Sequence, residues 1–316
     1  MLDVVCIGAA TEDLFFFSDS FEIADQKVFL PWGEKFAVGR LERRFGGGAF
    51  NAAVACSRLG LGTALFGRVG NDRPGAAIKE FLEGERVSTK FLAVDSGFKT
   101  STSALLSSGG ERAIVMFRGE NDNLLDTSPD WDEVLDCRWL LVIDLAGTNN
   151  DLLFEVVERA GTRGIKLAYV PGQGELRLGK ERLKPVFAAA SVLVLNLYEA
   201  GMILGKRGGG AEGMLSEFRK LGVEMPVITK GPKGSVAYDG SQFYYQEATP
   251  KVRVVDRTGA GDAFSSTFTA GVVLGRAVPE ALLLAAKNSS SVVTRVGGTD
   301  GLLALSALER FGEDEE

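Results

Sequence analysis

The chain is organised around Asp256-Arg257-Thr258-Gly259-Ala260-Gly261-Asp262-Ala263-Phe264, a turn of small residues that leads into a helix. The residues that follow it, as far as Leu274, are mostly small or apolar and include no proline. A helix is therefore predicted to begin near Ala260. The residues that precede the turn, Lys251-Val252-Arg253-Val254-Val255, are typical of a short strand because they are rich in β-branched side chains.

The glycines of this turn indicate an anion-binding site. The first N–H groups of a helix have no partner and carry partial positive charge, and glycine lets a phosphate approach them closely. Asp262 would lie in the first helical turn, where the helix field favours its ionised form, so it could accept a proton at neutral pH. Taken alone, the same stretch also suits an ordinary turn before a helix with an acidic start.

The composition limits the class of protein. A chain of 316 residues with 45% hydrophobic content can bury a substantial core, and no repeat, linker or low-complexity segment divides it. We therefore expect a single α/β domain over residues 1–316. The net charge is −7 and no run of Lys or Arg occurs, which argues against nucleic acid or an anionic membrane as partner. The chain has no histidine, so carboxylates must do any acid–base work.

The cysteines and the N-terminus predict the compartment. Cys6, Cys56 and Cys137 are odd in number, widely spaced and set in apolar segments. They are therefore predicted to be reduced core residues rather than a disulfide or zinc framework. The N-terminus lacks the basic region of a signal peptide, and no apolar run is long enough for a membrane span. A cytoplasmic protein is expected.

Short apolar runs alternate with helical segments along the chain. This alternation predicts right-handed βαβ units and a largely parallel sheet. Several runs end in a polar residue, and ligands bind at the carboxyl ends of such strands. The runs are Val4-Val5-Cys6-Ile7-Gly8, Ala64-Leu65-Phe66-Gly67, Leu140-Leu141-Val142-Ile143-Asp144, Leu167-Ala168-Tyr169-Val170, Val192-Leu193-Val194-Leu195-Asn196 and Val227-Ile228-Thr229-Lys230-Gly231.

Two early segments carry candidate substrate-binding groups. Asp13 follows the first strand and could receive sugar hydroxyls, or it could be a loop or N-cap aspartate. Gly46-Gly47-Gly48-Ala49-Phe50-Asn51 opens a helix that runs to Leu59. The glycines would permit close approach of a ligand, and Asn51 offers one donor and one acceptor group. The alternative is a glycine turn that allows tight helix packing, since the spacing is that of neither a dinucleotide fingerprint nor a P-loop.

Two later segments follow their strands at once. In Asn196-Leu197-Tyr198-Glu199, residues three apart share a helix face, so the amide and the carboxylate could together orient a hydrated Mg²⁺. The same pair also suits a helix cap with an acidic first turn. In Thr229-Lys230-Gly231-Pro232-Lys233-Gly234, the hydroxyl and the glycines could border a nucleotide, or the segment could be a plain turn before Ser235.

Residues 14–44 and 98–119 are predicted to be insertions that form a small β lid. In the second insertion, Ser103-Ala104-Leu105-Leu106 and Ala113-Ile114-Val115-Met116-Phe117 flank a glycine turn, which is a hairpin signal. The first insertion contains Leu14-Phe15-Phe16-Phe17, and consecutive phenylalanines are hard to bury in a thin lid alone. A homodimer through the lid is therefore expected.

The four motifs together resemble the ribokinase-like PfkB carbohydrate kinases. The motifs are Gly47–Asn51, Asn196–Glu199, Thr229–Gly234 and Asp256–Asp262, in the order and approximate spacing of that family, and the resemblance covers essentially the whole chain. Each motif alone is weak, but the ordered set is specific. The resemblance implies a doubly wound α/β fold with a β lid and an enzyme that moves the γ-phosphate of ATP to a sugar or nucleoside hydroxyl.

The resemblance also implies a role for each matching residue. Asp262 resembles the catalytic base, and Gly259, Ala260 and Gly261 resemble the anion hole. The implied sugar contacts are Asp13, Gly47, Gly48 and Asn51. The implied contacts on the side of ATP are Asn196 and Glu199, which would order Mg²⁺ through water, and Thr229, Gly231, Gly234 and Asn288, which would lie along the nucleotide.

The resemblance also implies a monovalent cation such as K⁺ beside the anion hole. The matching positions are Asp256, Thr258, Val292, Arg295 and Gly297. The chain departs from the family at two places: Arg257 stands where a small hydroxyl residue is usual, and Gly301 offers no side-chain ligand. The second departure removes a side-chain ligand from the implied cation site.

The sequence leaves the acceptor open among sugars, sugar acids and nucleosides. A nucleoside kinase is the main alternative to a carbohydrate kinase, because lid aromatics could stack on a base. Arg118, at the exit of the second lid strand, could pair with the carboxylate of a sugar acid, or be an ordinary exposed arginine. A catalytically silent protein that binds a sugar or nucleotide is a third hypothesis, against which the intact base and anion hole argue.

Overall fold

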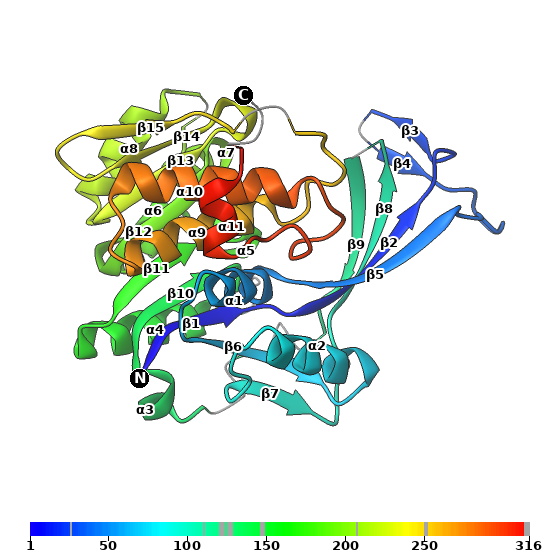
Figure 1. The fold of residues 1–316 in the computed structure, drawn as a ribbon, viewed down its shortest axis with the longest axis horizontal. Helices are drawn as coiled ribbons and strands as arrows, with labels where there is room; N and C mark the ends of the chain where they lie inside the picture. Colours follow the sequence, from blue (N-terminus) through cyan, green and yellow to red (C-terminus); the bar gives the residue numbers. More distant parts are fainter. Residues whose placement is uncertain are drawn as a thin grey trace.

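A large, mostly parallel sheet forms the centre of the protein. The structure is a computed structural model that describes residues 1–25, 27–109, 111–119, 124, 129–145, 149–206, 208–249 and 252–312. Within these residues nine strands lie in the order β15-β14-β13-β12-β11-β10-β1-β6-β7 (Figure 1). All neighbours from β13 to β7 pair in parallel, whereas β14 and β15 pair antiparallel at one edge. The strands are β1 (Leu2–Gly8), β6 (Thr63–Gly70), β7 (Leu92–Asp95), β10 (Cys137–Ile143), β11 (Lys166–Val170), β12 (Ala190–Asn196), β13 (Met225–Thr229), β14 (Ser235–Tyr238) and β15 (Phe243–Gln246).

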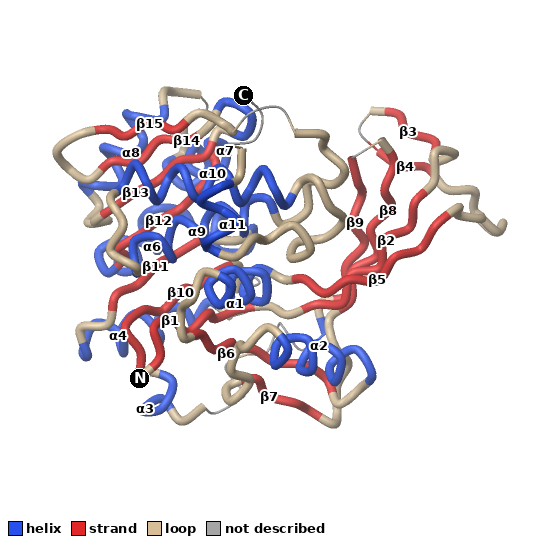
Figure 2. Tube along the Cα trace, viewed as in Figure 1, coloured by secondary structure: helices blue, strands red, loops and turns tan. Residues whose placement is uncertain are grey.

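Helices cover both faces of this sheet, as the predicted doubly wound fold requires (Figure 2). One face packs against α1 (Gly48–Arg58), α2 (Arg73–Gly84), α9 (Ala260–Val273), α10 (Val278–Val292) and α11 (Leu305–Arg310). The other packs against α3 (Trp131–Val134), α4 (Asn150–Arg163), α5 (Gln173–Leu176), α6 (Gly179–Ala189), α7 (Leu197–Leu204) and α8 (Ala211–Lys220). The fold prediction is confirmed.

Strand β1 shows why the sequence gives a sheet buried on both sides. Side chains alternate between the two faces of a strand. Val4 and Cys6 enter the core under α1 and α9, while Val5 and Ile7 enter the core under α4 and α6, and all four are fully buried. An uninterrupted apolar run is therefore the pattern that this position needs.

The strand order reverses beside β1. From β1 the chain goes first to β6 and β7 on one side, and later to β10, β11, β12 and β13 on the other. In such folds, ligands bind outside the carboxyl ends of the strands at the point of reversal. Here that point lies between β1 and β10, which pair from Leu2↔Cys137 to Gly8↔Ile143.

A separate four-stranded sheet stands beside the main domain, to the right in Figure 1, and fits a lid; we call it the lid sheet. Its order is β5-β2-β8-β9, from β2 (Thr11–Phe17), β5 (Arg40–Gly46), β8 (Thr102–Ser108) and β9 (Glu111–Phe117). The predicted hairpin is confirmed, because β8 and β9 pair antiparallel. A further pair, β3 (Glu22–Ala24) and β4 (Lys27–Phe29), lies near one end of this sheet.

The two faces of the lid sheet differ. Phe15 is fully buried against Leu105 and Val296, so its face packs toward the main domain. We call this the inner face. The outer face carries the alternate residues, including Leu41, Val115 and Phe117, which are 57%, 65% and 57% exposed. The stretch Phe15–Phe17 thus belongs to the lid sheet, outside the core of the main sheet.

The strand expected over Lys251–Val255 is wrong for residues 252–255, and residue 251 lies outside the described residues. The amides of Val255 and Asp256 donate to the carbonyl of Val293, at 2.7 and 3.3 Å, so the end of α10 holds this segment rather than a neighbouring strand. β-branched composition favours a strand only where a partner is present.

Cys6, Cys56 and Cys137 are buried and free of disulfides, as predicted. In the described part of the chain, we find no helix with the length and apolar character to cross a membrane.

Candidate active site

Helix α9 begins at Ala260, as predicted, and its start faces open space. Gly259 is the N-cap with a φ of 75°, and a Cβ there would lie 2.4 Å from the Cα of Gly298, so only glycine fits. The amides of Gly261 and Asp262 have no hydrogen-bond acceptor among the described residues, and a Cβ at Gly261 would meet nothing within 4 Å. Two unpaired amides with room in front of them suit a phosphoryl group.

Asp262 is held from the side by Asn51. The side-chain amide of Asn51, on α1, donates to Oδ2 of Asp262 across 2.8 Å. Asn51 is buried, and its Oδ1 has no donor among the described residues. A buried acceptor without a partner is costly, and a ligand hydroxyl is the kind of group that would satisfy it. The structure thus brings Asn51 and Asp262 together from positions 211 residues apart.

Burial raises the pKa of Asp262 to about 6, and the hydrogen bond from Asn51 opposes this rise. The charges of Asp144 and Asp13 raise the pKa further, whereas Arg112 lowers it. A general base works best when its pKa lies near the operating pH. Asp262 is therefore mostly ionised at neutral pH and is still basic enough to take a proton.

Asp13 lies within β2, on the inner face of the lid sheet, and so is neither the loop nor the N-cap residue that the sequence left open. Its side chain is buried, and the hydroxyls of Thr11 (3.1 Å) and Ser103 donate to it. Burial raises its pKa to about 6, against these hydrogen bonds. Gly47 and Gly48 form the N-cap and first residue of α1, the helix that also carries Asn51.

Asn196 and Glu199 cap α7 reciprocally. Oδ1 of Asn196 accepts from the amide of Glu199 at 2.9 Å, and Oε2 of Glu199 accepts from the amide of Asn196 at 2.8 Å. Burial raises the pKa of Glu199, the bond from Asn196 opposes it, and the charges of Asp144 and Asp262 add to the rise. The helix cap is therefore real, and it fixes both side chains within electrostatic reach of Asp262.

The predicted nucleotide contacts divide into two groups. Thr229 ends β13 directly opposite Asn196 on β12, and Gly231 and Gly234 border the 3₁₀ turn that follows. Asn288 behaves differently, because its side chain is fully buried, donates to Thr267 at 2.8 Å and accepts from the amide of Leu303 at 3.0 Å. Its polar groups join α10 to α9 and to the segment before α11.

Asp144 is a site residue that the sequence motifs did not indicate. It lies at the carboxyl end of β10, beside the point of strand reversal. Asp144 has a φ of 43°, an uncommon conformation for a residue other than glycine and one that often marks functional sites. Its charge raises the pKa of both Asp262 and Glu199. The available signal was an apolar run that ends in an acidic residue.

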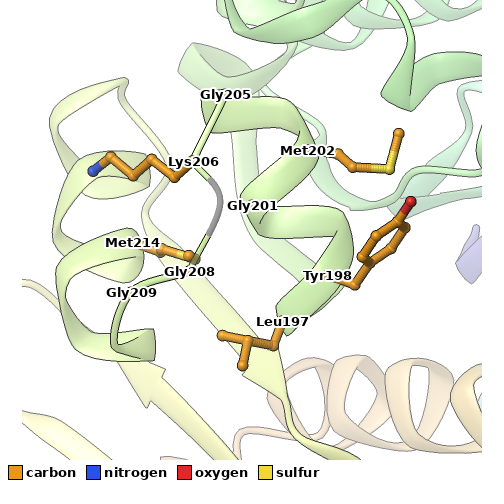
Figure 3. Close-up of a pocket in the computed structure, with 9 residues that line it drawn as sticks. All are labelled: Leu197, Tyr198, Gly201, Met202, Gly205, Lys206, Gly208, Gly209 and Met214. Atoms are coloured by element: carbon orange, nitrogen blue, oxygen red, sulfur yellow. The ribbon is translucent and has the colours of Figure 1, made fainter.

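A cavity of about 700 Å³ lies beside α7 and α8, next to the Asn196–Glu199 motif (Figure 3). Its lining includes Leu197, Tyr198 and Met202 from α7, Met214 from α8, and the glycine-rich segment between the helices. The described residues of its lining include no carboxylate, so they offer no base. The acid–base chemistry is therefore better placed at Asp262.

Three of the predicted cation positions come together. Oδ1 of Asp256 accepts from the amide and the hydroxyl of Thr258, at 3.1 and 2.8 Å, and its Oδ2 accepts from the amide of Gly297 at 3.0 Å. The carbonyl of Val292 accepts from the amide of Arg295 at 3.1 Å. Asp256 itself is 2% exposed.

Known proteins resemble this chain along most of its length. The sequence profile described as pfkB family carbohydrate kinase matches residues 1–304. A 5-dehydro-2-deoxygluconokinase of Halalkalibacterium halodurans is 25% identical over 285 residues, which are 86% of this chain and 86% of that protein. A nucleoside kinase of Methanothermobacter thermautotrophicus is 25% identical over 274 residues, 86% of this chain and 83% of that protein.

The fold is also similar to that of a known kinase. The structure of Arabidopsis thaliana ribokinase complexed with ribose and ATP superposes with a TM-score of 0.83 at 22% identity, covering 98% of each chain. At that identity the likeness shows the fold, while the profile match shows the family. This chain belongs to the pfkB family of carbohydrate kinases and is therefore a phosphotransferase.

Proposed function

We propose that this protein transfers the γ-phosphate of ATP to a hydroxyl group of a sugar or sugar derivative, with Asp262 as the general base. The observation that carries the proposal is the position of Asp262. Its carboxylate accepts from Asn51 at 2.8 Å and has a pKa raised to about 6. It lies at a helix start where two amides have no acceptor among the described residues. Base, anion hole and acceptor-binding amide thus meet in one place.

The residues imply the following reaction. Asp13 and Asn51 hold hydroxyls of the acceptor, and Asp262 removes the proton from the hydroxyl that attacks. The new O–P bond forms as the bond between the γ-phosphorus and the ADP oxygen breaks, and ADP leaves. The amides of Gly261 and Asp262 face the charge on the transferred group, so catalysis comes mainly from positioning and charge stabilisation.

The groups on the ATP side fit their proposed roles. Asn196 and Thr229 end neighbouring strands, opposite one another, and Glu199 lies one helical turn beyond Asn196. Bound Mg²⁺ would neutralise phosphate charge there, and Asn196 and Glu199 would orient it through water. Within this loop Gly231 and Gly234 carry no side chain, and a Cβ at Gly231 would meet nothing within 4 Å. Among the described residues, no group of three acidic or cysteine side chains forms a metal cage, which suits a metal held mostly by phosphates and water.

A sugar acid is the acceptor class that we favour first. The name 5-dehydro-2-deoxygluconokinase refers to an acceptor derived from gluconate. Asp13 pairs with Ser103 on β8, and Ser103 pairs with Met116 on β9. Arg118 lies two residues after Met116, just beyond the end of β9. Arg118 is exposed, and no ion pair to it occurs within the described residues. It can therefore bind a carboxylate on a sugar held by Asp13.

A nucleoside is the second candidate, in line with the nucleoside kinase relative. A base would need an aromatic surface on the inner face of the lid sheet. Phe15 and Phe17 share that face with Asp13, but Phe15 is fully buried and the guanidinium of Arg40 lies 3.8 Å from the ring centre of Phe17. The surrounding protein covers Phe15 and Arg40 covers Phe17, so neither ring is available to stack on a base. The geometry therefore favours a sugar.

A turnover screen with ATP and Mg²⁺ tests this function. Pentoses, hexoses, sugar acids and nucleosides would be offered separately, with release of ADP and formation of the phosphorylated product both measured. We expect product with a sugar or sugar acid, and Arg118→Gln should weaken turnover of sugar acids more than that of neutral sugars. Binding of ATP and acceptor by titration without product from any class would instead support the catalytically silent hypothesis.

A further inference from the structure

Two ion pairs join the tip of the lid hairpin to the loop before α9. Nη1 of Arg112 lies 4.0 Å from Oδ1 of Asp256, and Nη1 of Arg257 lies 3.5 Å from Oε1 of Glu111. Arg112 follows Glu111 directly in the sequence, and Arg257 follows Asp256 directly. The lid tip therefore contacts the segment that leads directly to the anion hole.

The pair between Arg112 and Asp256 is the more buried one. The side chain of Asp256 is 2% exposed and that of Arg112 is 24% exposed, against 56% for Arg257 and 70% for Glu111. Exposed ion pairs contribute little because water and salt screen them. The pair between Arg257 and Glu111 should therefore add little, whereas the guanidinium of Arg112 lies close enough to act on carboxylates of the site. Arg112 also lowers the pKa of both Asp13 and Asp262.

Strand register puts Arg112 on the inner face of the lid sheet. Asp13 pairs with Ser103, and Arg112 pairs with Ser107, four residues further along β8. Residues separated by an even number share a face of a strand. Nε of Arg112 is buried and has no acceptor among the described residues, so charge rather than a complete set of hydrogen bonds holds this side chain beside Asp256.

The residues around Asp256 do not fit a monovalent cation. Both oxygens of its carboxylate already accept hydrogen bonds, from Thr258 and from Gly297. A side-chain ligand at position 301 is excluded, because a Cβ on Gly301 would lie 2.5 Å from the Cα of Val292. A cation at this carboxylate would also be repelled by the guanidinium of Arg112.

We propose that Arg112 is a positioning residue whose guanidinium supplies the positive charge beside Asp256 and the anion hole, so that this enzyme needs no monovalent cation. The lid tip would bring this charge into place as part of the chain. The inference rests on the proposed function for its kinetic consequence alone, since its consequence for stability requires no substrate.

The test compares K⁺, Na⁺ and choline chloride at constant ionic strength. The thermal midpoint of the free protein and kcat/KM with a confirmed acceptor would be measured for the parent, Arg112→Gln, Arg112→Lys and a matched control. Arg43→Gln is that control, because Arg43 is also a lid arginine in an ion pair, with Glu12 at 3.0 Å.

We expect the parent, Arg112→Lys and Arg43→Gln to have the same midpoint and kcat/KM in all three salts. In choline, Arg112→Gln should lose about tenfold or more in kcat/KM, the effect of one opposite charge at 4–6 Å. K⁺ should not restore that loss, because both oxygens of Asp256 stay occupied and position 301 still offers no side-chain ligand. The midpoint of this variant should lie below that of the parent in all three salts.

Two outcomes overturn the proposal. One is a saturable gain of the parent in midpoint or kcat/KM with K⁺ relative to choline. The other is an Arg112→Gln variant that matches the parent in every salt. If no acceptor is phosphorylated by any form, the proposed function fails, and the midpoints still decide whether Arg112 replaces the cation.

Discussion

The side-chain amide of Asn51 lies 2.8 Å from the carboxylate of Asp262 and donates to it, which joins the start of α1 to the start of α9. This contact favours the ionised form of Asp262. The same residue presents its other polar atom, Oδ1, without a protein donor among the described residues. One amide can therefore serve both the proposed base and the proposed acceptor.

Asn51→Asp should raise the pKa that limits activity. The substitution keeps the shape of the side chain but puts a second carboxylate beside Asp262, and two adjacent carboxylates do not both ionise readily. We expect the acidic limb of the profile of kcat/KM against pH to move from near 6 to higher pH, with activity at pH 7 partly recovered at pH 8–9. An unchanged limb would mean that another group controls it.

Asp262→Asn should reduce kcat by roughly 10²–10⁴-fold, the usual contribution of a general base, equivalent to about 3–5 kcal/mol of barrier. Nucleotide affinity should be preserved, because the helix start is unchanged. The variant should be at least as stable as the parent at pH 7, since it removes a desolvated carboxylate that lies near Asp13 and Asp144. Turnover within threefold of the parent, measured beside the thermal midpoint, would show that Asp262 is not the base.

Stability should depend on pH through Asp13 and Asp262. Both have a folded pKa of about 6, above the ordinary 3.8 of an aspartate. The folded state therefore binds more protons than the unfolded state between these values, and the stabilisation present below about pH 3.8 is lost as the pH rises through 6. Between pH 4 and pH 7, the thermal midpoint of Asp262→Asn should fall less steeply than that of the parent. Identical slopes in parent and variant would argue against a raised pKa.

Glu199→Gln should weaken Mg²⁺-dependent turnover and leave acceptor binding nearly intact. Glutamine retains an oxygen that can accept from the amide of Asn196, so the cap of α7 should survive. Residues that orient the ligands of a metal typically contribute roughly 10–100-fold. Turnover as a function of Mg²⁺ and acceptor affinity by titration separate the two effects. Loss of acceptor binding with unchanged Mg²⁺ dependence would contradict the assignment.

The outer face of the lid sheet should form a homodimer contact. Leu41, Val115 and Phe117 expose apolar side chains on this face, and a patch of this kind commonly marks an interface between subunits. Val115→Glu should shift the protein to a monomer in analytical ultracentrifugation. Glu111→Gln, at the same hairpin but without an apolar change, is the control. A parent that sediments as a monomer at all concentrations would contradict the dimer.

Much of the fold follows from local sequence, because the spacing of apolar residues and the positions of turn residues are local features. The start of α9 at Ala260, the helix after Gly48 and the hairpin over β8 and β9 were all predictable in this way. The run Lys251–Val255 shows the limit of that approach. Its composition suits a strand, but residues 252–255 do not form one.

The missed site residues depend on contacts far apart in the chain. Arg112 reaches Asp256 only through the register of the lid sheet and the way the sheet packs on Val296. Asp144 matters because its strand lies at the reversal of strand order. Conversely, Asn288 matched a nucleotide contact by motif, but its side chain is used in packing. Motif position alone does not reveal whether a side chain reaches a cleft.

Strands β2 and β5 pair along their whole length, from Thr11↔Gly46 at one end to Phe17↔Arg40 at the other. The excursion of the chain into the lid therefore leaves and rejoins the main domain at the same point. Segments that depart and return together can change in length or composition without displacing what lies on either side. Residues 18–39 could thus vary in sequence and length while Asp13 and Asn51 keep their positions. The same proposed catalytic residues could then act on different acceptors.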